Sequence, residues 1–415
     1  MRGWPDVYLP PAFISKHPTL SLRDSYSGEL IQLGDQEFTS YVCGITPYDA
    51  THLGHAATYL TFDLIHRFQI ASGKALQFTE NITDIDDPLL ERANRDGLDW
   101  KLLATSQIDL FREDMTELRI LPPSHYLGVV ESMEIVIAHI KSLIDSGKTY
   151  TLDGDIYLDL GAVQGAIENL PIPFDEAIRV FASRGGDPDR AGKHHPLDTL
   201  IWLSERPGEP SWPSEFGNGR PGWHIECVAI ALSTLSGRDS DSALSHGSIT
   251  LQGGGSDLRF PHHYMTSVQA SVITGKRFAD IYVHTGMISW QGEKMSKSLG
   301  NLVFVSKLRE AGWSGNEIRW ALIKRNYRED FAWDSTYLSN ARRDLLRINS
   351  ALSREEVAPT AVVVETLSVA LSQDLDVERA IEAIIEWCVD TESGSTGGSS
   401  GELARAIDLY LGIAL

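Results

Sequence analysis

The sequence is poor in cysteine and has no long apolar run. It contains three cysteines, Cys43, Cys227 and Cys388, in 415 residues, too few for the disulfide framework of a small secreted protein. No apolar run approaches the roughly 20 residues that a membrane-spanning helix needs. The start of the chain also lacks the charged and apolar segments of a secretory signal. We therefore expect reduced thiols, no membrane partner and a cytoplasmic location.

An excess of positive charge is also lacking. The chain has 36 lysines and arginines against 57 aspartates and glutamates, a net charge of −21 at pH 7. Proteins that bind nucleic acids gather lysines and arginines, because neutralising phosphates releases counterions and so supplies affinity. No long basic run interrupts the acidic composition. A large polyanionic partner is therefore disfavoured.

Nothing in the sequence demands an oligomer, so we expect a monomer.

What the sequence does contain begins with an alternation of strand and helix. Residues 38–43 predict a strand, 55–71 a helix and 75–80 a second strand, after which Asn81–Asp84 follow. Strand, helix and strand in succession are the start of a parallel α/β sheet. Ligands in such sheets bind at the carboxyl ends of the strands. We therefore expect a site where Cys43 and Asn81–Asp84 lie.

The remainder of the chain predicts less regular elements, followed by helices. Residues 149–160 predict a hairpin that turns at Asp153-Gly154. The stretch 182–221 is rich in glycine, proline and charge and predicts an irregular insertion, whereas 236–248 predicts an exposed loop. Helical patterns dominate from Asn316, with a Gly/Ser break at 392–401 before a last short helix.

Two distant segments have residues suited to binding phosphates. Thr51-His52-Leu53-Gly54-His55 lies where the first helix begins, and the amino end of a helix offers unpaired N–H groups to anions. Glu293–Asn301 is a Ser/Gly-rich loop with two lysines three residues apart, Lys294 and Lys297. These lysines can close over a triphosphate and stabilise a departing pyrophosphate.

Together, these segments resemble the paired signature motifs of class I aminoacyl-tRNA synthetases. The resemblance implies an α/β fold with a Rossmann-like parallel sheet, an insertion and a C-terminal helical domain. It also implies attack by a carboxylate on the α-phosphorus of ATP, a reaction that depends on positioning and charge stabilisation. His52, His55, Lys294 and Lys297 suit that catalysis, with Mg²⁺ on the phosphates of ATP.

The expected segments are the two halves of the catalytic domain at 1–125 and 220–290, a connective insertion at 126–219, the signature-lysine loop region at 291–335 and a short helical domain at 336–415.

Two thiols and an imidazole, dispersed along the chain, are not a metal motif by themselves, and the case for a metal depends on a resemblance. Cys43, Cys227 and His262 are of the residue types that bind zinc, and three protein ligands leave a fourth position open for a substrate thiolate. Their segments resemble those of cysteinyl-tRNA synthetases, whose zinc holds the thiol of the substrate. That family completes the zinc shell with a glutamate where this chain has Thr266. The resemblance therefore implies one zinc ion per chain on three ligands, with His263 in place of His262 as the alternative.

The same resemblance implies the residues that surround a cysteinyl adenylate. They are Cys43, Gly44, Ile45, Thr46, Thr58, Asn81, Ile82, Thr83, Trp223, Gly255, Ser256, Asp257 and Ile288. For Thr58, Trp223 and Ile288, a role in packing alone is the alternative.

Other features distinguish the chain from a tRNA-charging enzyme. The resemblance to cysteinyl-tRNA synthetases weakens after roughly residue 340, and the short acidic tail that follows is poorly suited to a phosphate backbone. His55 stands where those synthetases usually have asparagine. Ser183–Arg190 resembles the Glu-Arg-Gly-Gly-Asp-Pro signature of the cysteine ligases of mycothiol biosynthesis, with Ser183 in place of the glutamate, and Tyr48–Leu60 is similar to that family throughout.

This second resemblance implies an AMP-forming ligase that makes a carbon–nitrogen bond. L-cysteine would be activated by ATP as its adenylate and joined to the amine of glucosaminyl-inositol, with release of pyrophosphate and AMP and without tRNA. The loop Arg184–Pro188 would close over the site or shape the acceptor pocket. The sequence does not identify a base, for which the candidates are Asp84, Asp86, Asp87 and Asp257. A minimal cysteinyl-tRNA synthetase and a non-catalytic paralogue that binds cysteine or nucleotide are the alternatives.

Overall fold

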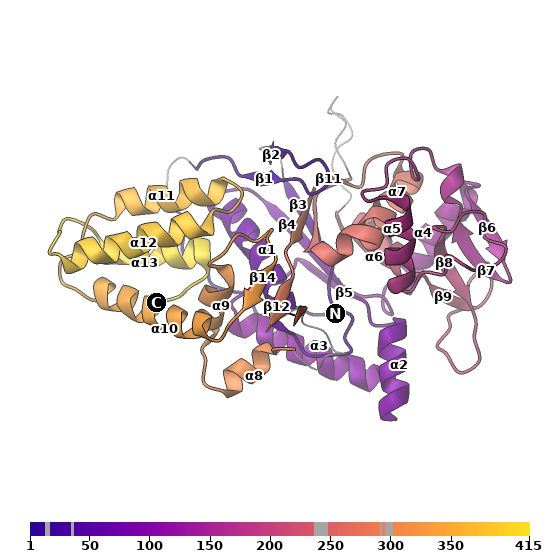
Figure 1. The fold of residues 1–415 in the computed structure, drawn as a ribbon, viewed down its shortest axis with the longest axis horizontal. Coiled ribbons are helices and arrows are strands. Elements are labelled where there is room, and N and C mark those ends of the chain that lie inside the picture. The colour runs from indigo at the N-terminus through magenta and orange to yellow at the C-terminus, as the bar shows by residue number, and fades with distance from the viewer. Residues whose placement is uncertain (13–16, 35–36, 236–247, 291–292, 295–301) are drawn as a thin grey trace.

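A five-stranded parallel sheet forms the centre of the molecule (Figure 1). The computed structural model describes residues 1–415 except 13–16, 35–36, 236–247, 291–292 and 295–301. All neighbouring strands of this sheet run parallel. Their order across the sheet is β11 (Ala279–Thr285), β10 (Ile249–Gly255), β3 (Phe38–Val42), β4 (Leu76–Ile82) and β5 (His125–Gly128). The predicted α/β fold class with a parallel sheet is therefore confirmed.

Helices cover both faces of this sheet, so its strands are buried on both sides. Side chains of β3 alternate accordingly: Phe38 and Val42 belong to one hydrophobic cluster, and Tyr41 belongs to the other. The first cluster includes α1 (Leu53–Ala71), and the second includes α4 (Met133–Asp145), α6 (Trp223–Leu235) and α7 (Tyr264–Thr274). Helices α2 (Asp87–Asp96) and α3 (Trp100–Glu117) connect β4 to β5.

A four-stranded antiparallel sheet lies at one end of the molecule (Figure 1). It contains β6 (Thr149–Leu152), β7 (Asp155–Leu158), β8 (Thr199–Ser204) and β9 (Gly219–Pro221), and α5 (Phe174–Ser183) lies between β7 and β8 in the chain. The predicted hairpin is confirmed, because β6 and β7 pair across Asp153 and Gly154, both at positive φ.

The stretch 182–221 is more regular than its composition predicts, since it supplies β8 and β9. Gly219 in this stretch and Gly222 just after it stand where strands approach closely. A Cβ at Gly219 would lie 2.2 Å from the carbonyl oxygen of Leu203, and one at Gly222 would lie 2.0 Å from that of Leu200. These glycines therefore permit strand packing rather than a loop.

The C-terminal part is mainly helical and lies at the opposite end of the molecule from the antiparallel sheet (Figure 1). A small sheet of β13 (Glu293–Lys294), β12 (Ile288–Trp290) and β14 (Phe331–Trp333) leads into it. The helices are α8 (Val305–Glu310), α9 (Gly315–Ile323), α10 (Thr336–Leu352), α11 (Ala361–Ser372), α12 (Val377–Glu392) and α13 (Ser400–Leu411). The predicted break separates α12 from α13, and the predicted loop at 236–248 lies almost wholly outside the described residues.

A buried ion cluster joins this helical part to the central sheet. Asp63 on α1 pairs with Arg67, with 2.7 Å between Nε and Oδ2, and with Arg319 on α9. All three side chains are fully buried. Arg67 also donates to the carbonyl oxygen of Asp408 on α13, at 3.0 Å.

Among the described residues, no helix is both long and apolar enough to cross a membrane.

Candidate active site

A cavity of about 470 Å³ opens at the carboxyl ends of β3 and β10. These neighbouring strands come from distant parts of the chain, and the crevice between such strands is where open α/β sheets bind ligands. Most of the expected site residues line this cavity: Cys43, Gly44, Ile45, Thr46, His52, His55, Thr58, Asn81, Thr83, Trp223, Cys227, Gly255, Asp257, His262 and Ile288.

The other expected site residues do not line the cavity or cannot be assessed. Ile82 is fully buried in the core cluster on the α1 side of the sheet. Ser256 opens a short 3-10 helix, Ser256–Leu258, beside the lining residues Gly255 and Asp257. The side chain of Lys294 and the whole of Lys297 lie outside the described residues.

The first helix presents its amino end to the cavity, with His52 as its N-cap. The Nδ1 atom of His52 accepts hydrogen bonds from the backbone N–H groups of Gly54, at 3.1 Å, and His55, at 3.4 Å. A neutral imidazole that accepts at Nδ1 must carry its proton on Nε2. His52 is thereby fixed in the tautomer that donates from Nε2.

His55 stacks against His52, with ring centroids 3.8 Å apart. Burial, together with the neighbouring His52 ring, holds the pKa of His55 well below its usual value. Both rings are lining residues of the cavity. The amino end of α1 therefore offers neutral imidazole N–H donors together with helix N–H groups, an arrangement suited to phosphate oxygens.

The chain on either side of the lysine segment is anchored at this cavity. The backbone of Lys294 pairs with that of Ser289 on β12. Beyond the undescribed residues, Leu53 N donates to the Val303 carbonyl at 2.9 Å, and Val305 N donates to that of Thr51 at 3.0 Å. The flank after the segment therefore lies beside the amino end of α1, and the flank before it is paired with β12, whose Ile288 lines the cavity.

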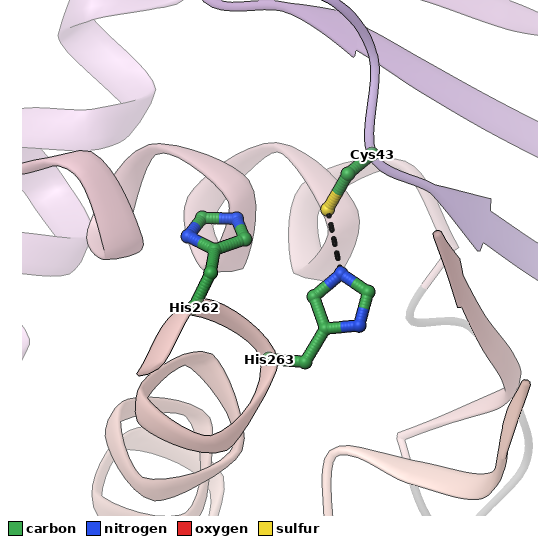
Figure 2. Close-up of side chains that lie close together, drawn as sticks. All are labelled: Cys43, His262 and His263. Atoms are coloured by element: carbon green, nitrogen blue, oxygen red, sulfur yellow. Dashed lines mark hydrogen bonds between the residues drawn. The ribbon is translucent and has the colours of Figure 1, made fainter. Parts of the chain in front are cut away.

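Thiols and imidazoles gather on the other side of the cavity. The Sγ of Cys43 lies 3.1 Å from Nε2 of His263, and the Sγ of Cys227 lies 3.3 Å from Nε2 of His262. The ligating atoms of Cys43, His262 and His263 are all within 4.8 Å of one another (Figure 2). The thiols of Cys43 and Cys227 are also near enough for each to shift the pKa of the other. Cys43, His262 and His263 therefore form a compact group of potential ligands for a soft metal, and Cys227 adjoins this group through its contact with His262.

Two further histidines, which the sequence analysis did not single out, orient the first pair. Nδ1 of His224 lies 3.0 Å from Nδ1 of His262, and Nε2 of His284 lies 2.8 Å from Nδ1 of His263. Histidines that bind metals usually use the second ring nitrogen in such a contact. The sequence offered only a weak signal for these two histidines: His224 follows Trp223 directly, and His284 lies at the carboxyl end of β11.

The electrostatics of the two thiols differ. Burial raises the pKa of Cys43 well above its usual value. Hydrogen bonding with Cys43 lowers the pKa of Cys227 well below its usual value, because this effect and the nearby His262 outweigh burial. One thiolate is thus already stabilised by its neighbours, as expected of a metal-binding pair.

Thr266 stands four residues after His262, where a fourth ligand would come from in the related synthetases. Its hydroxyl donates to the carbonyl oxygen of His263 at 2.9 Å and accepts from Nε2 of Gln252 at 3.1 Å. The side chain is fully buried and engaged in these bonds. Thr266 therefore has a structural role at this position.

Two polar contacts connect the cavity to neighbouring elements. Arg184, at the end of α5, pairs with the lining residue Asp257, with 3.3 Å between Nη1 and Oδ2. The hydroxyl of Thr46, also a lining residue, donates to Oδ2 of Asp86 at 3.4 Å.

Tyr59 also lines the cavity, although the sequence analysis did not expect it there. Its hydroxyl donates to the carbonyl oxygen of Cys43 at 3.2 Å.

Solved structures of aminoacyl-tRNA synthetases share this fold. Methionyl-tRNA synthetase of Mycobacterium tuberculosis, in complex with methionyl-adenylate, aligns with a TM-score of 0.64 and 16% identity over 91% of this chain and 88% of that one. A ternary LeuRS–tRNA–LeuAMS complex of Agrobacterium radiobacter gives a TM-score of 0.65 at 12% identity, over 91% and 84% of the two chains. At these identities the likeness shows the fold alone.

Sequence relatives are much more similar. Residues 29–343 match the family model for the catalytic domain of class I (C) tRNA synthetases. An L-cysteine:1D-myo-inositol 2-amino-2-deoxy-alpha-D-glucopyranoside ligase of Streptomyces griseus is 46% identical, and one of Rhodococcus erythropolis is 47% identical, each over 100% of both chains. A ligase 2 of the same name from Corynebacterium jeikeium is 45% identical over 100% of both chains. The chain therefore belongs to the family of L-cysteine:1D-myo-inositol 2-amino-2-deoxy-alpha-D-glucopyranoside ligases, within the class I (C) tRNA synthetase group.

Proposed function

We propose that this protein activates L-cysteine with ATP and joins the cysteinyl group to the amine of glucosaminyl-inositol, releasing pyrophosphate and AMP. The observation that carries the proposal is a single cavity that has a phosphate-binding helix end on one side and a Cys/Cys/His cluster on the other. Adenylate formation needs these two features side by side, because the cysteine carboxylate must reach the α-phosphorus of ATP. The full-length similarity to the named ligases supports the choice of acceptor.

At the helix end, the chain's contribution is positioning and charge stabilisation. The Nε2–H of His52 and the ring of His55 would donate hydrogen bonds to phosphate oxygens as negative charge develops there. Lys294 and Lys297 would assist, with Mg²⁺ on the phosphates, because both flanks of their segment lie at the cavity. No covalent bond between the enzyme and the substrate is required.

At the other side of the cavity, Cys43, Cys227 and His262 would hold one Zn²⁺. These three side chains line the cavity, whereas His263 is not among the lining residues. A buried cluster of two thiols and an imidazole fits zinc, and the ion would favour the soft thiolate of cysteine over the hydroxyl of serine. His263 would then orient Cys43 through its contact with Sγ rather than bind the metal.

Removal of the zinc ligands tests this assignment. Cys43→Ser and Cys227→Ser should each abolish bound zinc, measured by atomic absorption, and cysteine-dependent pyrophosphate exchange together. His262→Ala should do the same, whereas His263→Ala should keep the metal. Cys388→Ala on α12 is the matched control, because Cys388 is buried away from the cavity. Zinc retained in both cysteine variants would refute the ligand set.

The acceptor is tested by product analysis. We would measure AMP formation from ATP and L-cysteine with glucosaminyl-inositol, with tRNA specific for cysteine and with neither. AMP and a new amide with the amino sugar alone is the expected result. Charging of tRNA would instead identify a minimal synthetase, and no turnover with either acceptor would favour a binding protein. We further expect a monomer that is located in the cytoplasm. Sedimentation of the purified protein would check the oligomeric state.

A further inference from the structure

The contact between Thr46 and Asp86 connects the cavity to a carboxylate outside its lining. Thr46 follows β3 and lines the cavity, and Asp86 is the N-cap of α2. The two oxygens of Asp86 have different partners. Oδ1 accepts from the backbone N–H of Asp87 at 2.9 Å, and Oδ2 accepts from the Thr46 hydroxyl at 3.4 Å. A proton at Thr46 therefore has a direct route to Oδ2.

The other acidic side chains near the cavity are engaged differently. Asp84 is buried and accepts from the backbone N–H of Val130 at 2.9 Å, which ties the end of β4 to the turn after β5. Asp49 pairs with Arg92 at 2.8 Å. Both of these contacts hold the fold together around the cavity.

The two remaining candidate carboxylates are each neutralised by a guanidinium. Asp87 is exposed and pairs with Arg220, and Asp257 pairs with Arg184 at 3.3 Å. A proton arriving at either one would have to compete with its arginine. Asp86 has no ion pair among those that the described residues form, and it reaches the cavity through a hydroxyl that can both donate and accept.

The charged and titratable groups around Asp86 set its basicity. Burial and the adjacent Asp87 carboxylate together raise the pKa of Asp86 to about 6, although the backbone N–H of Asp87, Arg220 on β9 and the Thr46 hydroxyl oppose the shift. Glu226 on α6 also faces Asp86, and burial, with Asp86 among its neighbours, raises the pKa of Glu226 well above its usual value. Asp86 is therefore ionised at neutral pH yet more basic than an ordinary aspartate.

We propose that Thr46 and Asp86 form a proton relay for the second half-reaction, an inference that rests on the proposed function. The amine nitrogen attacks the carbonyl carbon of the cysteinyl adenylate, a C–N bond forms, and AMP departs with the electron pair of the broken C–O bond. The proton shed by the nitrogen passes to Oγ1 of Thr46 as the hydroxyl proton passes to Oδ2 of Asp86. Thr46 touches the substrate, and Asp86 acts through it.

The central variant is Asp86→Asn, which keeps the shape and the helix cap because asparagine is also a good N-cap. Pyrophosphate exchange with ATP and cysteine reports the first half-reaction and should be unchanged. Single-turnover amide formation, with preformed adenylate and glucosaminyl-inositol, should fall about 100-fold or more. Asp86→Glu should restore part of that rate, and Thr46→Ser, which retains the hydroxyl, should keep most of it.

The pH dependence separates a proton relay from a structural role. In the unmodified enzyme the amide-forming rate should rise with pH through about 6, where Asp86 becomes ionised, and Asp86→Asn should lack this rise. Asp87→Asn is the matched control on the same helix. It should retain the rate but move the rise to lower pH, because Asp87 raises the pKa of Asp86.

The outcomes distinguish this relay from the function on which it depends. If the unmodified enzyme forms no amide, the proposed acceptor is wrong. If it forms amide and Asp86→Asn does so at the same rate with the same pH profile, the relay is wrong and the proposed function stands. Equal losses in both half-reactions, with no change in pH profile, would also overturn the relay in favour of a structural role for Asp86.

Discussion

At the residue scale, His52 combines a structural and a chemical task in one ring. Its Nδ1 caps α1 by accepting from Gly54 and His55, and this leaves the proton on Nε2 for a ligand. The position of the His52 ring also explains the glycine two residues later, because a Cβ at Gly54 would lie 2.8 Å from that ring. The two roles can be separated, because other side chains cap helices equally well.

Replacement of His52 should therefore give two different results. His52→Ala removes the cap and should lower the free energy of unfolding by about 1 kcal/mol, whereas His52→Asn keeps a capping side chain and should leave stability close to that of the unmodified protein. Both should reduce cysteine-dependent pyrophosphate exchange by about 100-fold, since each lacks the Nε2–H donor. Thermal unfolding and pyrophosphate exchange measure the two effects. Full exchange activity in His52→Asn would contradict the donor role.

The site residues that the sequence could indicate are those in continuous motifs or at strand ends, such as His52, Cys43 and Asn81. Their position follows from local pattern and from the rule that parallel sheets bind ligands at carboxyl ends. The partners of His262 and His263 could not be found in this way. His224 and His284 come from α6 and β11, and their contacts with His262 and His263 depend on how these elements pack.

At the element scale, the segment after α5 reaches from the antiparallel sheet to the cavity. Asp187 accepts from the hydroxyl of Tyr157 and from Lys193, and Arg190 pairs with the buried Asp155 at 2.6 Å. These contacts fix the segment on its own sheet. Arg184 then extends from it to Asp257 at the cavity, which links the insertion to the lining.

Loss of Arg184 tests the role of this segment in acceptor binding. We expect Arg184→Ala to raise the KM for glucosaminyl-inositol several-fold with zinc content unchanged. Thermal stability should change little, because a partly exposed ion pair contributes about 1 kcal/mol or less. Arg379→Ala, at an exposed position on α12, is the control. Unchanged kinetics for both cysteine and the amino sugar would exclude a role of Arg184 in the reaction.

The elements themselves were largely predictable where a single pattern continues over many residues. The helix expected at 55–71 is α1, and the strands expected at 38–43 and 75–80 are β3 and β4. Strands β8 and β9 were not predicted, because Gly219 and Gly222 are also the residues of loops. Only the approach of the neighbouring backbone shows why glycine is needed there.

At the scale of the whole molecule, the buried cluster of Asp63, Arg67 and Arg319 joins parts that are far apart in the chain. Burial opposes ionisation of Asp63, but Arg319 and Arg67 outweigh it and lower its pKa below the usual value. Burial lowers the pKa of Arg319 to about 10, so Asp63 and Arg319 are both charged at neutral pH. Removing the one carboxylate would leave two buried guanidinium groups without their counter-charge.

Asp63→Asn should therefore destabilise the protein by about 3–5 kcal/mol, measured by denaturant unfolding at pH 7. The difference from the unmodified protein should persist above pH ~4, the usual pKa of aspartate, and disappear as the pH falls through the lowered pKa of Asp63 in the folded protein. Asp145→Asn, which removes an exposed pair with Lys141, should leave the free energy of unfolding almost unchanged. Equal effects of the two substitutions would show that the buried cluster does not couple these elements.

The packing of α13 against α1 also sets an order of events during synthesis. Helix α1, whose amino end lies at the cavity, leaves the ribosome early, yet part of its covering comes from residues 400–411. Arg67 and Arg319 take backbone carbonyl partners from Asp408 and Leu411. Until translation has reached those residues, the apolar face of α1 and two buried arginines lack their final neighbours. The carboxyl-terminal half of α1, which contains Arg67, therefore completes its packing only after the last helix has been synthesised.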